Sequence, residues 1–152
     1  MDKLAIRPAA ERARLSTQPF FTLFINIDTF KTAVLEYIAD LYLDEAGKNI
    51  IRSVPVISYA LYINDYALEH PNLYNALIHD GFFKKEKYHN WIEKVVVQQS
   101  ERSDNVRDFL IWIHGKILTE GPKNPTQLVH EIRDLEGFPT VPKHFHYVEN
   151  EM

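Results

Sequence analysis

The stretch that decides the fold is residues 49–68, which read NIIRSVPVISYALYINDYAL. Drawn as a helix, this stretch carries apolar or aromatic side chains in almost every direction, beyond the stripe of roughly 100° that a surface helix shows. Arg52, Asn64 and Asp65 interrupt it, so its apolar runs are shorter than the ~20 residues of a membrane span. The sequence therefore predicts a central helix, over about residues 49–69, that its neighbours bury.

The start of this helix depends on Pro55. If Ser53 is the N-cap, the proline falls in the first turn, where its missing N–H leaves no intrahelical bond unmade. If the helix begins at Lys48 instead, the proline kinks it. In both cases we expect the side chains at its middle to be among the most buried of the chain, namely Ile57, Leu61 and Tyr62.

Length and composition limit the class of protein. The chain has 152 residues, of which 45% are hydrophobic and 25% charged, and it has no cysteine. That length suits one domain. The missing cysteine excludes disulfides and thiolate metal sites. A net charge of −4 without a basic stripe argues against nucleic acid as a partner, and we expect no membrane association. No signal peptide is visible, so we expect a cytoplasmic protein.

The segment before the central helix has apolar residues every three or four positions from Phe20 to Leu41, which is helical spacing. One alternative is a later helix start capped by Asp28 or Thr29, with residues 20–27 as a strand or an extended strap. Gly47 is expected to end this helix.

Helix start and stop signals divide the rest of the chain. Pro71 and Gly81 delimit a short helix, because proline favours the first helical position and glycine the position after the last. We expect three more helices, over residues 84–100, from Ser103 or Asp104 to Gly121, and from Asn124 to Gly137. The helix before Gly121 should bury Val106, Phe109, Leu110, Ile113 and Ile117.

These elements together predict an all-α fold, a single-domain bundle of five or six helices around the central helix, with extended N- and C-terminal segments. We expect a flexible N-terminal arm over residues 1–17, a helical domain over residues 18–137, and an extended aromatic and acidic tail over residues 138–152.

Three histidine patterns raise the possibility of a metal or haem protein. Glu86 and His89 have the Glu-x-x-His spacing of di-iron bundles, but a second such pair is missing. His114 lies on an apolar helix face and could ligate haem as a lone inward imidazole. His144 and His146 share one side of an extended segment and lack an identifiable third ligand. We therefore predict no metal site and no cofactor, and keep a helical metal or haem protein as the third reading.

Function is predicted by elimination. The sequence has no Gly-rich phosphate loop, no His-Glu-x-x-His motif and no nucleophile elbow, so we do not expect an enzyme. The favoured reading is a non-catalytic protein-binding or regulatory module that binds a protein partner or forms a homo-oligomer, because aromatic residues are abundant at 12%. The tail residues expected to bind the partner are Phe138, Pro139, Pro142, Phe145 and Tyr147.

The alternative reading is a small-molecule sensor or carrier. Its pocket would lie between helices, as ligand pockets of helical bundles do. The side chains expected to line it are Tyr59, Tyr62, Tyr66, Trp112 and His114.

Overall fold

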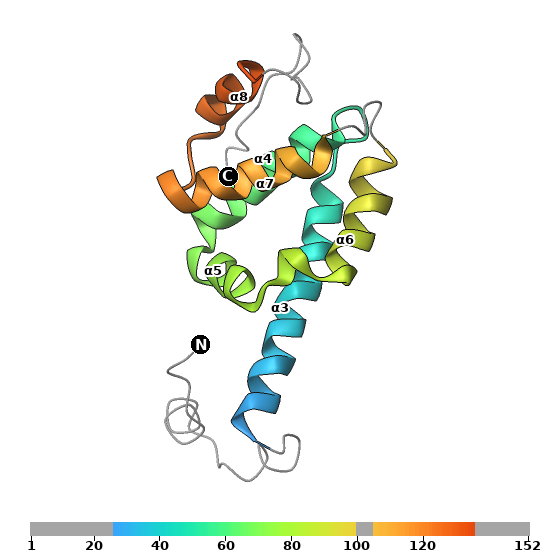
Figure 1. Cartoon of the computed structure of the whole chain (residues 1–152), viewed down its shortest axis with the longest axis vertical. Coiled ribbons are helices and arrows are strands. Elements are labelled where there is room, and N and C mark those ends of the chain that lie inside the picture. The colour runs from blue at the N-terminus through green and yellow to red at the C-terminus, as the bar shows by residue number, and fades with distance from the viewer. Residues whose placement is uncertain (1–25, 100–104, 136–152) are drawn as a thin grey trace. The chain divides into compact units, whose positions relative to one another are not determined.

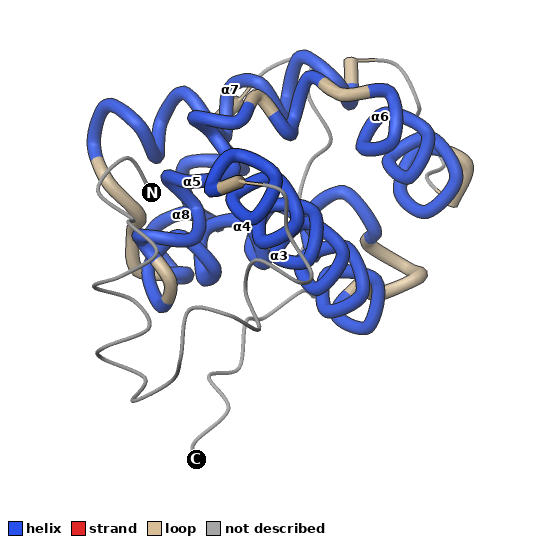
Figure 2. Tube along the Cα trace, turned by 90° about the horizontal axis from the view of Figure 1, so that it is seen from below, coloured by secondary structure: helices blue, strands red, loops and turns tan. Residues whose placement is uncertain are grey.

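The computed structural model describes residues 26–99 and 105–135 (Figure 1). Within these residues 83% are helical and none is in a strand, and Figure 2 shows only helices and loops. The all-α prediction is therefore confirmed. None of the described helices is long and apolar enough to cross a membrane. The predictions for residues 1–17, for residues 20–25 and for the tail lie outside the described residues.

The chain divides into two compact units, Met1–Tyr42 and Leu43–Met152. Helix α3 (Ile27–Asn49) begins in the first unit and ends in the second. Its start is capped by Asn26, whose Oδ1 accepts hydrogen bonds from the backbone N of Thr29 at 2.9 Å and from its Oγ1 at 3.1 Å. The helix thus takes the later start, but the cap is Asn26 and not Asp28 or Thr29.

The expected end of α3 at Gly47 is wrong, because the helix continues to Asn49. Lys48 pairs with Asp44 at 3.0 Å and with Glu45 at 3.2 Å, and Asn49 Nδ2 donates to the Glu45 carbonyl at 2.8 Å. These side-chain bonds hold the last turn, and together they offset the cost of about 1 kcal/mol that glycine adds inside a helix.

Helix α4 (Pro55–Glu69) is the central helix of the second unit, in contact with α5, η2, α7 and α8. This confirms the predicted centre of the bundle, but the helix begins at Pro55, with Val54 and not Ser53 as N-cap. The proline takes the first helical position and does not kink the helix. Ile57 and Leu61 are buried as expected. Tyr62 is only partly buried, which corrects its predicted burial.

Helix α5 (Pro71–Asp80) has the predicted boundaries, because Pro71 opens it and Gly81 closes it in the left-handed conformation with φ 70°. A 3-10 turn follows, η1 (Phe82–Lys84), in which Phe82 is buried.

The single helix expected over residues 84–100 is instead helix α6 (Glu86–Ile92) followed by a π-helical turn, η2 (Glu93–Val97). The backbone N of Gln98 bonds to the Glu93 carbonyl at 3.0 Å, the five-residue step of a π-turn. The wider π-turn changes the direction in which the side chains after it project from the helix axis. Tyr88 and Ile92 of α6 and Val96 of η2 are all buried.

Helix α7 (Val106–Glu120) confirms the predicted buried set, since Val106, Phe109, Leu110, Ile113 and Ile117 are all buried. Helix α8 (Pro125–Arg133) starts as predicted, with Asn124 Oδ1 accepting a hydrogen bond from the Thr126 backbone N at 2.9 Å. It ends at Arg133 and not at Gly137. The chain tightens there, because the N–H of Leu135 bonds to the Ile132 carbonyl only three residues back, at 3.2 Å.

Candidate functional site

Seven aromatic and imidazole rings from α4, α5, η1, α6 and α7 form a connected group in the second unit, which we call the aromatic cluster, and the exposed ring of His89 adjoins it 5.9 Å from that of Tyr88. The ring centroids of Phe83 and His114 lie 4.3 Å apart, and those of Phe83 and Tyr88 lie 5.0 Å apart. The Tyr88 ring also contacts Trp91 at 6.5 Å. Centroid distances of 4.5–7 Å are typical of favourable aromatic pairs. The members of the aromatic cluster are Tyr59, Tyr74, Phe82, Phe83, Tyr88, Trp91 and His114.

Two hydrogen bonds satisfy the phenols inside the aromatic cluster. The hydroxyls of Tyr59 and Tyr88 lie 2.7 Å apart, and the Tyr74 hydroxyl lies 2.8 Å from His114 Nδ1. Burial raises the pKa of Tyr74 and of Tyr88. The phenols therefore stay protonated at neutral pH, and each can donate a hydrogen bond.

His114 holds the polar atom of the aromatic cluster that needs an explanation. Burial lowers the pKa of His114 to about 4, so the imidazole is neutral at pH 7. Its ring stacks on that of Tyr74, with an interplanar angle of 14°. The other ring nitrogen, Nε2, is buried and has no hydrogen-bond partner among the described residues. If Tyr74 donates to Nδ1, Nε2 carries the proton and is a buried donor without an acceptor.

The structure brings only two of the five predicted pocket residues into the aromatic cluster, namely Tyr59 and His114. Tyr62 and Tyr66 instead form a row with His70, with centroid distances of 6.0 Å and 5.3 Å. Both of these tyrosines keep exposed surface.

Trp112 lies apart from His114 although the two are close in sequence. Residues two apart on an α-helix point about 200° from one another, so they project from nearly opposite sides of α7. The Trp112 ring stacks on Phe109 at 6.1 Å and lies 5.7 Å from Lys116 Nζ.

The sequence reading did not include Tyr74 and Phe83 in a site, although both contact His114. Tyr74 stands three residues before Leu77, on the buried side of α5. That spacing was the one signal for Tyr74, and it predicts burial rather than a bond to a histidine forty residues away.

Of the histidine patterns considered for a metal, the Glu86 and His89 pair and His114 lie in the described part of the chain. Glu86 and His89 are both exposed on α6. In the part of the chain that the structure describes, no three histidine, aspartate or glutamate side chains gather as a metal site requires. His144, His146 and the expected partner-binding residues of the tail lie outside that part.

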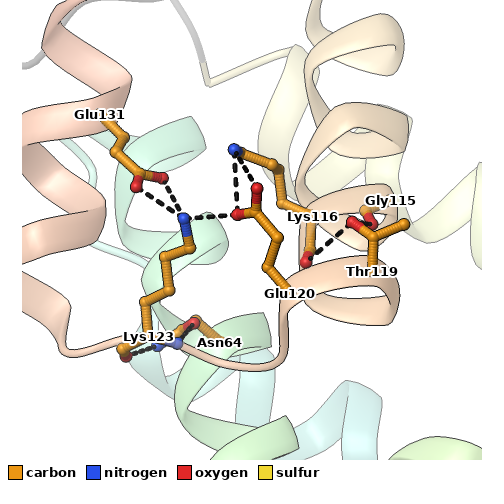
Figure 3. A network of polar contacts seen from close by, with 7 residues as sticks. All are labelled: Asn64, Gly115, Lys116, Thr119, Glu120, Lys123 and Glu131. Atoms are coloured by element: carbon orange, nitrogen blue, oxygen red, sulfur yellow. Dashed lines mark hydrogen bonds and ion pairs between the residues drawn. The ribbon is translucent and has the colours of Figure 1, made fainter.

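A polar network joins α4, α7 and α8 (Figure 3). The buried amide of Asn64 donates to the Lys123 carbonyl at 2.7 Å and accepts from the Lys123 backbone N at 2.8 Å. Lys123 Nζ lies 2.6 Å from carboxylate oxygens of both Glu120 and Glu131. The hydrogen bonds of these carboxylates raise the pKa of Lys123, so the amine stays protonated and is no nucleophile. The network fixes the segment that leads into α8.

Comparison with known proteins assigns no family to this chain, because no family model, no curated protein and no solved structure matches it.

Proposed function

We propose that this chain is a non-catalytic protein-binding module, and that it binds through apolar helix faces. The observation that carries the proposal is that large exposed apolar side chains occur in helical register. Tyr37 and Leu41, four residues apart on α3, are 65% and 46% exposed. Ile111 and Leu118, seven residues apart on α7, are 70% and 53% exposed. Grouped apolar exposure of this kind is typical of interaction surfaces, whereas single exposed residues are ordinary.

The outer face of α7 is suited to a helical partner. Ile111 and Leu118 flank Gly115, which is also exposed, and a Cβ placed on Gly115 would meet no atom within 4 Å. A glycine between two large apolar residues leaves a notch into which a side chain of another helix can pack. The opposite side of α7 is already used for the core, since Phe109 and Ile113 are buried there.

The polar groups of the second unit support a role without catalysis. His114 is neutral and largely enclosed by rings, and Lys123 is held by two carboxylates. A general base works best with a pKa near the operating pH, and a lysine nucleophile needs a lowered pKa. The pKa of His114 is lowered to about 4, away from neutral pH, and the pKa of Lys123 is raised where a nucleophile needs it lowered.

Affinity capture with the full chain as bait tests the proposal. We expect the wild type to retain at least one protein that the double variant Ile111→Glu, Leu118→Glu loses. The matched control is Ile51→Glu, Leu68→Glu, which changes residues that are 48% and 54% exposed and stand at opposite ends of α4, Ile51 before its start and Leu68 in its last turn. This control should retain the partner. Capture of the same proteins by all three baits would contradict a binding role for the α7 face. A cytoplasmic location belongs to the same proposal, and microscopy of the tagged chain tests it.

A second candidate function is a small-molecule sensor or carrier. It is favoured by Nε2 of His114, which has no hydrogen-bond partner within residues 26–99 and 105–135, because a buried polar atom without a partner is costly unless a water or a ligand satisfies it. A neutral ligand with an oxygen acceptor would satisfy this donor. Screening phenols and aryl ketones by thermal shift tests this function. We expect a ligand to raise the melting temperature of the wild type and leave that of His114→Phe unchanged, and equal shifts in both proteins would exclude the site.

A further inference from the structure

The phenol of Tyr74 and the imidazole of His114 carry one proton more than the hydrogen bond between them uses. Tyr74 is buried, and its hydroxyl lies 2.8 Å from His114 Nδ1. The phenol has one proton to donate, and a neutral imidazole has another. The single hydrogen bond takes up one of these protons, so the other needs an acceptor outside the pair.

One proton is left over whichever nitrogen of His114 is protonated. If the Tyr74 hydroxyl donates to Nδ1, the remaining proton is on Nε2. If Nδ1 donates to the hydroxyl oxygen, the hydroxyl proton remains, and Nε2 is in addition an acceptor without a donor. The first arrangement leaves one group unsatisfied and the second leaves two, so we assign the proton to Nε2. This nitrogen is buried and has no hydrogen-bond partner within residues 26–99 and 105–135.

The surroundings of His114 favour a neutral acceptor. Burial lowers the pKa of His114, and no charged side chain of the described residues contributes to the shift. An anion placed at Nε2 would therefore lose its hydration without gaining a counter-ion. The ring faces of Tyr74 and Phe83, which contact the imidazole, are only weak acceptors. A neutral oxygen, such as that of a ketone or an amide, accepts the proton without bringing a charge into the site.

An organic ligand fits this site better than a water molecule. A buried water makes about three hydrogen bonds to polar groups of the protein. The pair of Tyr74 and His114 offers one unsatisfied proton, and the adjacent Phe83 ring is apolar. A ketone oxygen needs only one donor, and the apolar body attached to it is stabilised by contact with apolar side chains.

Apolar side chains that such a body can cover lie next to His114. Ile111 stands three residues before His114 and Leu118 four residues after it, so the three are neighbours on one side of α7. Ile111 and Leu118 are 70% and 53% exposed, and His114 itself keeps some exposed surface. Because Nε2 is buried, access requires a neighbouring side chain to turn aside. Phe83, which is partly exposed and stands in the short turn η1, is placed to do so.

We propose that the pair of Tyr74 and His114 binds a small neutral organic molecule, whose oxygen accepts the Nε2 proton and whose apolar body covers Ile111 and Leu118. This inference rests on the second candidate function, because it names the ligand class of the same site. It excludes carboxylates, ammonium ions and hydrocarbons as ligands, so the site selects its ligand by a neutral oxygen acceptor.

Nuclear magnetic resonance of the full chain, with isotope-labelled histidine, tests the ligand class with two probes of nearly the same shape. Acetophenone has a ketone oxygen where α-methylstyrene has a methylene group. We expect acetophenone at millimolar concentration to shift the Nε2 signal of His114 in a saturable way, and α-methylstyrene to leave that signal in place. His114→Phe identifies the His114 signals by their loss. The exposed His130 of α8 is the internal control, because its signals should respond to neither probe.

The protonation of His114 is tested without a ligand. In the wild type we expect the proton on Nε2. In Tyr74→Phe, which has no hydroxyl to keep Nδ1 unprotonated, we expect a mixture of the two tautomers. A wild type with its proton on Nδ1 would overturn the assignment of Nε2 as the donor. Equal shifts with both probes, or no shift with acetophenone, would overturn the ligand class.

The failure of this inference differs from the failure of the second candidate function. A ligand whose thermal shift depends on His114, although acetophenone and α-methylstyrene act alike, would overturn the ligand class and keep the sensor or carrier function. A long-lived water in contact with the Nε2 proton, together with no response to acetophenone or to any screened ligand, would overturn both.

Discussion

Asn64 connects α4 to the segment before α8, and we expect Asn64→Ala to lower the free energy of unfolding by about 2–4 kcal/mol. The residue is 1% exposed, and its amide makes two hydrogen bonds, of 2.7 Å and 2.8 Å, to the backbone of Lys123. Alanine leaves both backbone groups without these partners, and an unsatisfied buried group costs about 1–3 kcal/mol. Lys123 is only partly buried, so water replaces part of the loss, which keeps the total in the lower part of the range.

Urea unfolding followed by circular dichroism measures this loss, with Asn75→Ala as the control. Asn75 is exposed on α5, so its replacement should change stability by less than about 0.5 kcal/mol. Asn64→Asp separates the two bonds, since a carboxylate still accepts from the Lys123 N–H but repels the Lys123 carbonyl. Only the protonated carboxyl can donate there, so its folded-state pKa is raised. The loss for Asn64→Asp should therefore shrink as the pH falls below that pKa. The loss for Asn64→Ala should not depend on pH.

A loss below about 0.5 kcal/mol for Asn64→Ala would refute this reasoning, because that is the range of surface substitutions. It would mean that water satisfies the Lys123 backbone in the folded protein, and that the amide of Asn64 is not what holds this segment against α4.

Four further expectations follow from the described contacts and from the sequence of the tail. Leu61→Ala, at a buried position of α4, should cost about 2–5 kcal/mol in urea unfolding, and a loss under about 1 kcal/mol would place it outside the core. Burial lowers the pKa of His114 to about 4, below the unfolded value of 6.5. Its contribution to stability is therefore full above about pH 6.5 and lost as the pH falls toward about 4, and His114→Phe should flatten that part of the stability profile. In thermal melts, Gly115→Ala should stabilise α7 by about 0.5–1 kcal/mol. Gly121→Ala should destabilise by about 1 kcal/mol or more, because its φ is +81°, and melting shifts of the same sign would contradict this contrast. Deleting residues 138–152 should leave the melting temperature nearly unchanged but reduce partner capture, whereas a less stable chain that keeps its partners would show a tail that serves folding.

The sequence predicted helices correctly where apolar spacing was regular or where a residue at a helix end had a strong backbone preference. The five buried positions of α7 follow from helical spacing alone. Pro71 with Gly81, and Asn124 with Pro125, mark helix ends because their backbone preferences are strong. Such features need no knowledge of the rest of the chain, and for that reason the sequence was sufficient to predict them.

The predictions of helix ends were wrong where contacts made by other side chains, and not the local backbone preference, decided where the helix stops or widens. Gly47 lies inside α3 because Lys48 and Asn49 make side-chain bonds that extend the helix. Residues 93–97 form a π-turn that no helical spacing predicts. Glycine inside a helix costs only about 1 kcal/mol, so a few contacts specific to this fold are enough to outweigh that preference.

The aromatic cluster could be predicted only in part. Tyr59 and His114 were expected to lie inward, and both do. Their neighbours could not be predicted, because Tyr74 and Phe83 reach His114 through the packing of α5 and η1 against α7. Pairings between residues thirty or more positions apart leave no periodic trace in a single sequence.

The spacing along α3 has the same limitation. Apolar residues every three or four positions predicted a helix, and α3 is one. The same spacing results whether a face is buried by its own chain, as at Ala39 and Tyr42, or is left exposed. Exposure separates the two cases, because Tyr37 and Leu41 keep about half or more of their surface in contact with solvent. Such exposure is costly, since each large apolar side chain left in water forgoes about 1.5–3 kcal/mol of burial. A partner that covers Tyr37 and Leu41 would recover that burial, so their exposure, and not the spacing of the apolar residues, is what supports a binding role for this face of α3.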